Sequence, residues 1–251
     1  MKILGSDFDG TLTHGGIGEA KCEAIRKWRA AGHKFGIISG RGIDFVPHIR
    51  QSYPSLEMDF IAVCSGAYIA DSERRLLHEV RCDTVSVPQF AMDLSAWGCK
   101  FITIVGKTQI FVVAKKEDRP SWISEKDAIL ISEMPVVDYF HQISVALPTV
   151  AESAAMVKKI REMYGEQVNP LQNGTCIDIV PRGLDKAKGM YFVMDVFGGC
   201  YDDVIVVGDN VNDMDMIKEF RSYAMENGVD AVKKTADFVI EDVVDLIEKE
   251  I

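Results

Sequence analysis

The sequence predicts an α/β protein in which a doubly wound, Rossmann-like parallel sheet is interrupted by an inserted α+β domain, and three observations support this fold class. Short apolar runs alternate with amphipathic stretches over residues 1–81, helix–strand–strand units replace them over residues 82–185, and the first pattern resumes over residues 186–251. Strand–helix alternation is typical of parallel sheets with helical crossovers. We therefore expect a core built from residues 1–81 and 186–251, with a separate domain over residues 82–185.

The N-terminal part should contain three strands and two helices. A helix is expected over residues 19–31, because Cys22, Ile25, Trp28 and Ala31 recur on one face and Gly32 follows as a stop. The second helix is expected near residues 44–51, and the strands at residues 3–6, 34–38 and 60–64.

The inserted part and the C-terminal part continue these two patterns. In the insert we expect a helix over 88–97, strands over 101–105 and 110–113, an alternating strand around residues 143–147, a helix over 150–164 and two further strands that end at 176–180. After the insert we expect a helix over 186–197, a strand over 204–207, a helix over 213–220, short strands near 223 and 238, and a terminal helix from 241. The strand Val204–Val207 is entirely apolar, as in a buried parallel strand.

The composition argues against several classes of protein. The 251-residue chain has a net charge of −10, which argues against nonspecific nucleic-acid binding, since that needs a basic surface. No run reaches the roughly 18 apolar residues of a membrane helix, and the charged residues near the N-terminus argue against a secretion signal. The six cysteines form no C-x-x-C pair and are read as reduced thiols. We expect a cytoplasmic protein.

The first chemical motif is Asp7-Phe8-Asp9-Gly10-Thr11-Leu12-Thr13, directly after the first strand. Ligands of open α/β sheets bind at the carboxyl ends of the strands. Two carboxylates placed there repel each other and are costly to desolvate, which favours a bound cation, and hard oxygen ligands favour Mg²⁺. A pair of aspartates in a surface turn is the alternative.

Two weaker motifs follow. Ser39-Gly40-Arg41 comes at the end of a predicted strand, where a hydroxyl and a backbone N–H could bind an anion together, although a helix-capping serine would have the same pattern. Lys186 begins a predicted helix. A single lysine at such a position is usually an exposed surface residue, and Lys188, two positions on, is the alternative to it.

The fourth motif, Gly208-Asp209-Asn210-Val211-Asn212-Asp213, follows the most apolar strand. Asp209 and Asp213 are one turn apart and could both lie over the strand end. A capping role at a helix start explains Asp213 well and Asp209 poorly.

Together these motifs resemble the haloacid dehalogenase-like hydrolase superfamily: D-x-D-G-T, a strand-terminal Ser or Thr, a late Lys and G-D-x-x-x-D. The chain is similar to its Cof-type, sugar-phosphatase-like subgroup (cap type IIB), also through Met225-Glu226-Asn227-Gly228, Val232-Lys233 and Ala236-Asp237. It departs from the subgroup at Ser65-Gly66-Ala67, where Asn-Gly-Ala is usual, and at Glu226 and Gly228.

The resemblance implies roles for these residues. Asp7 is the implied nucleophile, and it would form an aspartyl-phosphate. Asp9 is the implied general acid and base, and Mg²⁺ would bind Asp7, the Asp9 carbonyl and Asp209. The implied phosphoryl-binding groups are Ser39, Lys186, Asn212 and the N–H groups of Phe8 and Gly40, and Asp213 would orient Lys186 or a metal-bound water. Thr11 could equally brace its turn, and Arg41 could form an ion pair near the cap hinge.

The resemblance implies a Mg²⁺-dependent phosphatase of a small phosphorylated metabolite, with a sugar phosphate as the first expectation. A phosphoglycolate-type or other non-sugar phosphatase, a phosphomutase and a noncatalytic binding module are the alternatives. The intact set Asp7, Asp9, Lys186 and Asp209 argues against the binding module, and Ser39-Gly40-Arg41 argues against a mutase. Loops of the inserted domain at 106–109 and 171–175 would set the substrate.

Overall fold

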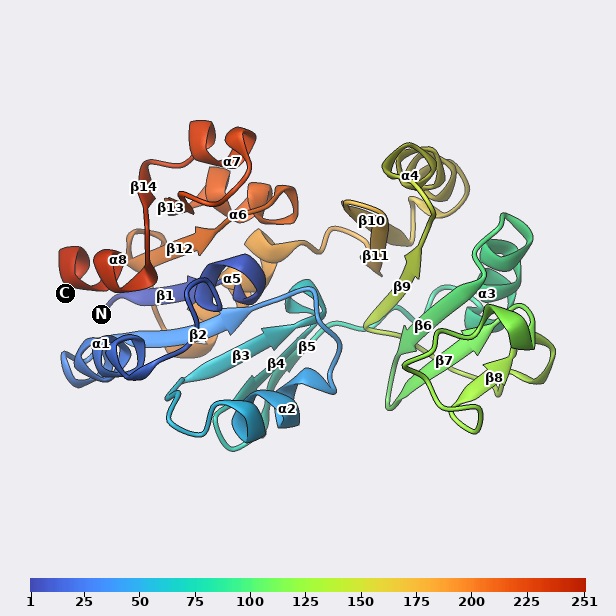
Figure 1. Ribbon diagram of the computed structural model, residues 1–251, viewed down its shortest axis with the longest axis horizontal. Coiled ribbons are helices and arrows are strands. Elements are labelled where there is room, and N and C mark those ends of the chain that lie inside the picture. Colours follow the sequence, from blue (N-terminus) through green and yellow to red (C-terminus); the bar gives the residue numbers. More distant parts are fainter. The chain divides into compact units, whose positions relative to one another are not determined.

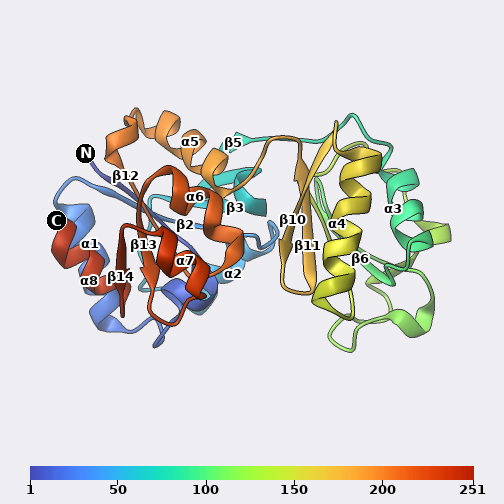
Figure 2. The ribbon, with the colours of Figure 1, turned by 90° about the horizontal axis from the view of Figure 1, so that it is seen from above.

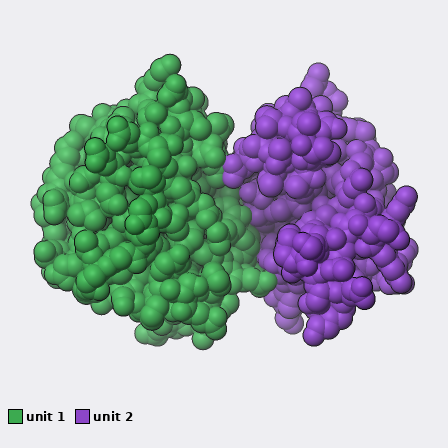
Figure 3. Space-filling view, in the orientation of Figure 1, with its two compact units in different colours: residues 1–79, 184–251 green, residues 80–183 purple.

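A computed structural model describes all 251 residues and divides them into two compact units, residues 1–79 with 184–251 and residues 80–183 (Figure 3). The first unit is built on one eight-stranded sheet, in the order β14-β13-β12-β1-β2-β3-β4-β5 (Figure 1). Its strands are β1 (Ile3–Ser6), β2 (Lys34–Ile38), β3 (Phe60–Val63), β4 (Tyr68–Asp71), β5 (Leu76–Glu79), β12 (Val204–Gly208), β13 (Arg221–Met225) and β14 (Phe238–Ile240).

The six strands from β14 to β3 are parallel, and this confirms the predicted fold class. Strands β1 and β12 pair in the centre, with Ile3 opposite Val204 and Ser6 opposite Val207, so the two ends of the chain form one sheet. Every residue of both strands is buried, and all of them except Ser6 are apolar, as in strands covered on both faces. The carboxyl ends of β12, β1 and β2 therefore lie side by side at one edge of the sheet.

Helices cover this sheet, and their bounds are α1 (Glu19–Ala30), α2 (Phe45–Ser52), α5 (Lys186–Phe197), α6 (Met214–Glu219), α7 (Asp230–Thr235) and α8 (Val243–Glu250). Helix α1 packs against α8, and α5 packs against α6. Met190 and Val193 of α5 share a core cluster with Val204 and Val206 of β12. Ala31, expected on the buried face of the first helix, is exposed, because α1 ends one residue earlier.

The second unit carries a six-stranded sheet in the order β10-β11-β9-β6-β7-β8. Its elements are α3 (Val87–Ala96), β6 (Phe101–Val105), β7 (Gln109–Val113), β8 (Ala128–Leu130), β9 (Gln142–Ala146), α4 (Val150–Tyr164), β10 (Val168–Asn173) and β11 (Cys176–Pro181). Figure 2 shows α3 and α4 on the same side of this sheet, where their apolar residues form one cluster with the strands.

Four elements differ from the sequence expectation. Strands β4 and β5 are an unpredicted antiparallel extension of the core sheet. Strand β8 pairs parallel with β7, so the second sheet is not purely antiparallel as expected. Helix α7 was also missed. These are elements of three to six residues, too short for a periodic pattern to develop.

The C-terminal helix is attached to the sheet by one buried carboxylate. Glu250 of α8 accepts hydrogen bonds from Arg221 at 2.6 and 2.8 Å and from the Tyr223 hydroxyl at 2.5 Å, and it forms an ion pair with Lys2 at 3.0 Å. Burial alone would raise the pKa of Glu250, but the hydrogen bonds from Tyr223, Lys2 and Arg221 together lower it from 4.5 to about 2. Glu250 is therefore ionised at neutral pH.

Replacing Glu250 by Gln should lower the free energy of unfolding by about 1–3 kcal/mol at pH 7, because charge-assisted hydrogen bonds are lost. With a pKa of about 2 in the folded state and 4.5 as the reference, this stabilisation is complete above about pH 4.5 and disappears as the pH falls through about 2. Urea unfolding of both proteins at pH 7 and pH 3 measures the difference, which should shrink at the lower pH. The exposed Glu248→Gln on the same helix is the control. A difference that does not change with pH would contradict the assignment.

Candidate functional site

Four of the sequence-predicted site residues meet at the carboxyl edge of the core sheet. Asp7 follows β1, Asp209 follows β12, Lys186 is the first residue of α5 and Asp213 ends the turn Val211–Asp213. Backbone bonding fixes the first of these, because the Asp7 N–H donates to the Val207 carbonyl at 2.9 Å and continues the β1–β12 pairing by one residue. Segments from both ends of the chain thus contribute to one site.

Lys186 is the centre of this group. Its side chain is 1% exposed, and its ammonium donates to Asp7 Oδ1 at 2.6 Å and to Asp213 Oδ1 at 2.5 Å. Burial alone would lower the pKa of Lys186, but the carboxylates of Asp213 and Asp7 raise it instead. Lys186 therefore stays protonated, and the alternative of an exposed lysine does not apply to it.

Asp213 combines this ion pair with a capping role. Its other carboxylate oxygen, Oδ2, accepts the backbone N–H groups of Asp209 and Asn210 at 3.0 and 3.1 Å. A Cβ at Gly208 would lie 2.6 Å from the Asp213 carboxylate, so this close approach requires glycine. The Asp213 side chain therefore fixes the turn that presents Asp209.

Asp209 is held from the other side by the first motif. The Thr11 hydroxyl donates to Asp209 Oδ1 at 2.7 Å. Gly10 has a φ of +81°, and a Cβ there would lie 2.5 Å from Asp209 Oδ2. Thr11 thus braces more than its own turn, because it orients a carboxylate almost 200 positions away in the sequence.

The donor set of this site fits a divalent cation. Asp7, Asp209 and Asp213 each offer a carboxylate oxygen, and these oxygens lie within 4.8 Å of one another. Burial and the Asp213 carboxylate raise the pKa of Asp7 to about 8 even though Lys186 opposes them. Burial, with Asp213, also raises the pKa of Asp209. One ammonium does not compensate three carboxylates, and hard oxygen ligands suit Mg²⁺.

Asp9 lies apart from this cluster and is paired with Arg41. The Arg41 guanidinium donates to both carboxylate oxygens of Asp9, at 2.6 and 2.7 Å. It also lies over the rings of Phe8 and Phe45, 5.1 and 4.7 Å from their centroids. Arg41 is therefore an ion-pair partner that holds the Asp9 side chain in one orientation.

Ser39 and Asn212 have different surroundings. Ser39 directly follows β2 and is 2% exposed. Its hydroxyl oxygen accepts a hydrogen bond from the Arg41 N–H at 3.2 Å, and this bond stabilises the turn Ser39-Gly40-Arg41. Asn212 is half-buried in the turn Val211–Asp213, and no hydrogen bond joins its side chain to the other site residues.

Sequence reasoning did not identify two of these connections. The Asn227 amide donates to the Gly10 carbonyl at 2.9 Å and ties a C-terminal loop to the first motif. The pairing of Arg41 with Asp9 was not identified either. For Asn227 the only available signal was its place in the segment Met225-Glu226-Asn227-Gly228, which is similar to the subgroup. For Arg41 the signal was its position just after a predicted strand.

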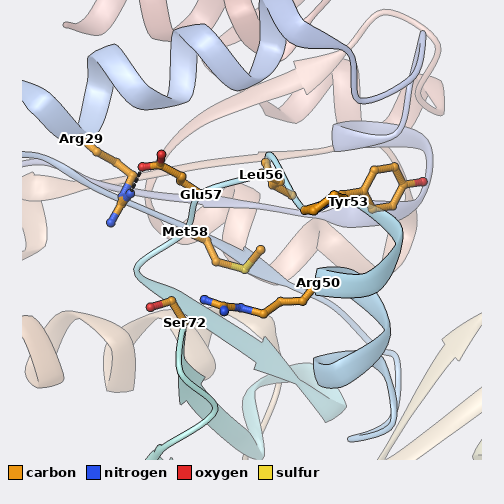
Figure 4. Close-up of a pocket in the computed structure, with 8 residues that line it drawn as sticks. Arg29, Arg50, Tyr53, Leu56, Glu57, Met58 and Ser72 are labelled. Carbon is orange, nitrogen blue, oxygen red and sulfur yellow. Dashed lines mark hydrogen bonds and ion pairs between the residues drawn. The ribbon is translucent and has the colours of Figure 1, made fainter.

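A pocket of about 350 Å³ in the same unit is separate from this site (Figure 4). It lies beside the start of β3 and the end of β4, and it is lined by Arg29, Arg50, Tyr53, Pro54, Leu56, Glu57, Met58 and Ser72. Arg29 is already paired with Glu57 and Asp59. The pocket contains none of the predicted site residues.

Replacing Lys186 by Met should destabilise the protein by about 3–5 kcal/mol, because two buried carboxylates would lose their counter-charge. Adding Asp213→Asn to that variant should restore part of the loss, since one of these charges is then removed while an acceptor oxygen remains. Denaturant unfolding of the two single variants and the double variant measures the coupling. Purely additive losses would mean that the two side chains do not interact energetically.

Two curated proteins with similar sequences are named as phosphatases. The chain is 24% identical over 246 residues to an Escherichia coli protein named 5-amino-6-(5-phospho-D-ribitylamino)uracil phosphatase, covering 90% of this chain and 86% of that protein. It is 23% identical over 231 residues, 86% of its length, to a Streptococcus pyogenes protein named a bifunctional phosphatase/peptidyl-prolyl cis-trans isomerase, of which it spans only 45%.

Solved structures share the fold over the whole chain. A haloacid dehalogenase-like hydrolase from B. subtilis superposes with a TM-score of 0.81 at 16% identity, covering 100% of both chains. A sugar phosphatase of HAD subclass IIB gives 0.77 at 19% identity, covering 99% of this chain and 98% of that one. Residues 4–245 match the model of the haloacid dehalogenase-like hydrolases, and with the fold and site described above the chain belongs to this family of enzymes.

Proposed function

We propose that this phosphatase of the haloacid dehalogenase-like family hydrolyses a small phosphorylated metabolite in a Mg²⁺-dependent reaction through an aspartyl-phosphate on Asp7. The observation that carries the proposal is the buried Lys186 ammonium shared by Asp7 and Asp213, beside Asp209. A cationic group next to a carboxylate at a strand end favours binding of an anionic phosphoryl group there.

The carboxylates of Asp7 and Asp209 and the backbone carbonyl of Asp9 would hold the metal. When bound, Mg²⁺ would neutralise charge on the phosphoryl oxygens and reduce their repulsion of the nucleophile. Thr11 supports this arrangement, because its hydrogen bond to Asp209 Oδ1 fixes the orientation of that carboxylate.

Asp7 is the proposed nucleophile. Lys186 holds Asp7 Oδ1, which leaves Oδ2 to attack phosphorus. The new bond joins Asp7 Oδ2 to phosphorus, and the bond between phosphorus and the leaving oxygen breaks. The protonated Lys186 and the Ser39 hydroxyl would bind phosphoryl oxygens, as would the N–H groups of Phe8 and Gly40 and the Asn212 side chain. Positioned donors of this kind stabilise the charge that spreads over these oxygens.

Asp9 is the proposed acid and base. It would give its proton to the leaving oxygen, and it would then take a proton from the water that attacks phosphorus and releases Asp7 and inorganic phosphate. Arg41 donates one hydrogen bond to each oxygen of Asp9 and so orients this carboxylate, and each oxygen keeps a second lone pair for the proton.

The proposed substrate class is a sugar or sugar-alcohol phosphate, and residues 82–185 are the proposed cap that selects it. Two relatives support this choice through their names, a sugar phosphatase and a phosphatase of a phosphoribitylamino compound. A screen of phosphorylated metabolites, with released phosphate measured, tests the class directly. Turnover restricted to non-sugar esters would reject it.

Asp7→Asn should reduce turnover to background while the protein remains folded, because the shape is kept and the nucleophilic charge is lost. EDTA should abolish the wild-type activity, and added Mg²⁺ should restore it. Released phosphate and the melting temperature are measured together. Turnover by folded, purified Asp7→Asn protein would rule out the covalent mechanism.

Asp9→Asn should lower kcat by about 10²–10⁴, the usual contribution of a positioned acid–base group. The loss should be smaller for 4-nitrophenyl phosphate than for a hexose phosphate, because a good leaving group needs little protonation. Metal binding should persist, since the proposed contact is the Asp9 carbonyl. Equal losses for both substrates together with a lowered melting temperature would instead indicate a structural role for Asp9.

A further inference from the structure

The turn after β3 has an unusual backbone. Cys64 and Ser65 have φ values of +53° and +55°, and Gly66 follows at +97°, so three consecutive residues are in the left-handed region. Arg74 is the one other residue besides glycine with a positive φ, at +67°. Side chains with a Cβ are strained in this region, and strain of this kind persists where the surrounding structure enforces it.

The surrounding contacts show what enforces the turn. The Cys64 N–H donates to the Arg41 carbonyl at 2.8 Å, and the Ser65 N–H donates to the Ser39 carbonyl at 2.9 Å. On the other side, a Cβ at Gly66 would lie 2.4 Å from the Cα of Gly189 in α5. The turn is therefore fixed between the Ser39–Arg41 segment and the helix that begins with Lys186.

These contacts use only the backbone and Gly66, and they leave the Ser65 side chain unexplained. The Ser65 residue is 4% exposed, and no hydrogen bond joins its hydroxyl to another protein group. Its oxygen is not among the enclosed side-chain atoms that lack a partner, so it can be reached from outside the protein. A glycine would adopt the same φ without strain. A hydroxyl in a side chain buried to this extent usually has a hydrogen-bond partner, and because its oxygen can be reached from outside, we look for that partner in a bound ligand.

Its position indicates which part of the substrate that partner is. The proposed phosphoryl site is formed at the ends of three neighbouring strands: Asp209 follows β12, Asp7 follows β1 and Ser39 follows β2. Ser65 follows the next strand, β3, one strand farther from Asp209. A group bound there would belong to the part of the substrate beyond the phosphoryl group.

We propose that the Ser65 hydroxyl is a specificity-determining group that hydrogen-bonds a hydroxyl of the leaving group. This rests on the proposed phosphatase function and deepens it, because it selects a hydroxylated ester over a plain one. The strained backbone is then the conformation that places the side chain at this edge.

The test compares Ser65→Gly and Ser65→Ala with the wild type on two substrates. One is the best sugar substrate among glucose 6-phosphate, ribose 5-phosphate, erythrose 4-phosphate and ribitol 5-phosphate. The other is 4-nitrophenyl phosphate, whose leaving group has no hydroxyl besides the one released. Both variants should lower kcat/KM for the sugar substrate about 3- to 10-fold, mainly through KM, the usual loss for one neutral hydrogen bond. For 4-nitrophenyl phosphate kcat/KM should stay within about twofold.

Stability separates this role from a structural one. Ser65→Gly relieves strain, so its melting temperature should be unchanged or higher even though sugar turnover falls. Arg74→Gly is the matched control, because it relieves the same kind of strain in a distant turn and should leave both substrates unaffected.

Four outcomes are distinguishable. Unchanged sugar kinetics in both Ser65 variants would overturn the inference, as would equal losses on both substrates. A wild-type enzyme that hydrolyses 4-nitrophenyl phosphate but none of the four sugar substrates would overturn the sugar class, and one that hydrolyses no phosphate ester would overturn the proposed function itself.

Discussion

The ammonium group of Lys186 connects parts of the chain that are far apart in sequence. It donates to Asp7 after β1 and to Asp213 beyond β12, and it begins α5. Two buried carboxylates without this counter-charge would be strongly unfavourable at these positions. The residues that follow the inserted unit must therefore return to the edge of the sheet at a fixed point. The three carboxylates around one ammonium leave excess negative charge, which is the electrostatic basis of the proposed cation site.

Most of the core fold could be predicted because its determinants are local. The apolar run Val204–Val207 and the helix that begins at Lys186 each carry their own pattern, and the positions of the motifs at strand ends follow from the topology. Strands β4, β5 and β8 and helix α7 could not be predicted, because three to six residues give no periodicity. The parallel pairing of β8 with β7 depends on tertiary contacts that no local pattern encodes.

The candidate site, like the fold, contains residues that could be predicted from the sequence and contacts that could not. Residue type and strand position marked Asp7, Asp209 and Asp213, and the family resemblance added Lys186. The structure brings these four residues together. The partner of Asp9 could not be identified, because Arg41 is distant in sequence and only the packing of its guanidinium on Phe8 and Phe45 aims it at that carboxylate. The strained backbone of Ser65 was likewise not predictable, since serine has no strong preference for that region.

The departures from ordinary folding rules are concentrated at one edge of the core sheet. The buried carboxylates Asp7 and Asp213, the Lys186 ammonium, the raised pKa of Asp7 and the left-handed residues Cys64 and Ser65 all follow β1, β3 or β12, or begin α5. The strand interiors beneath them are apolar and fully buried. Unfavourable local choices persist where a regular and well-packed scaffold enforces them. The regular sheet thus supports a charged and strained site. The packing of the sheet alone does not require the positions of the Arg41 and Ser65 side chains.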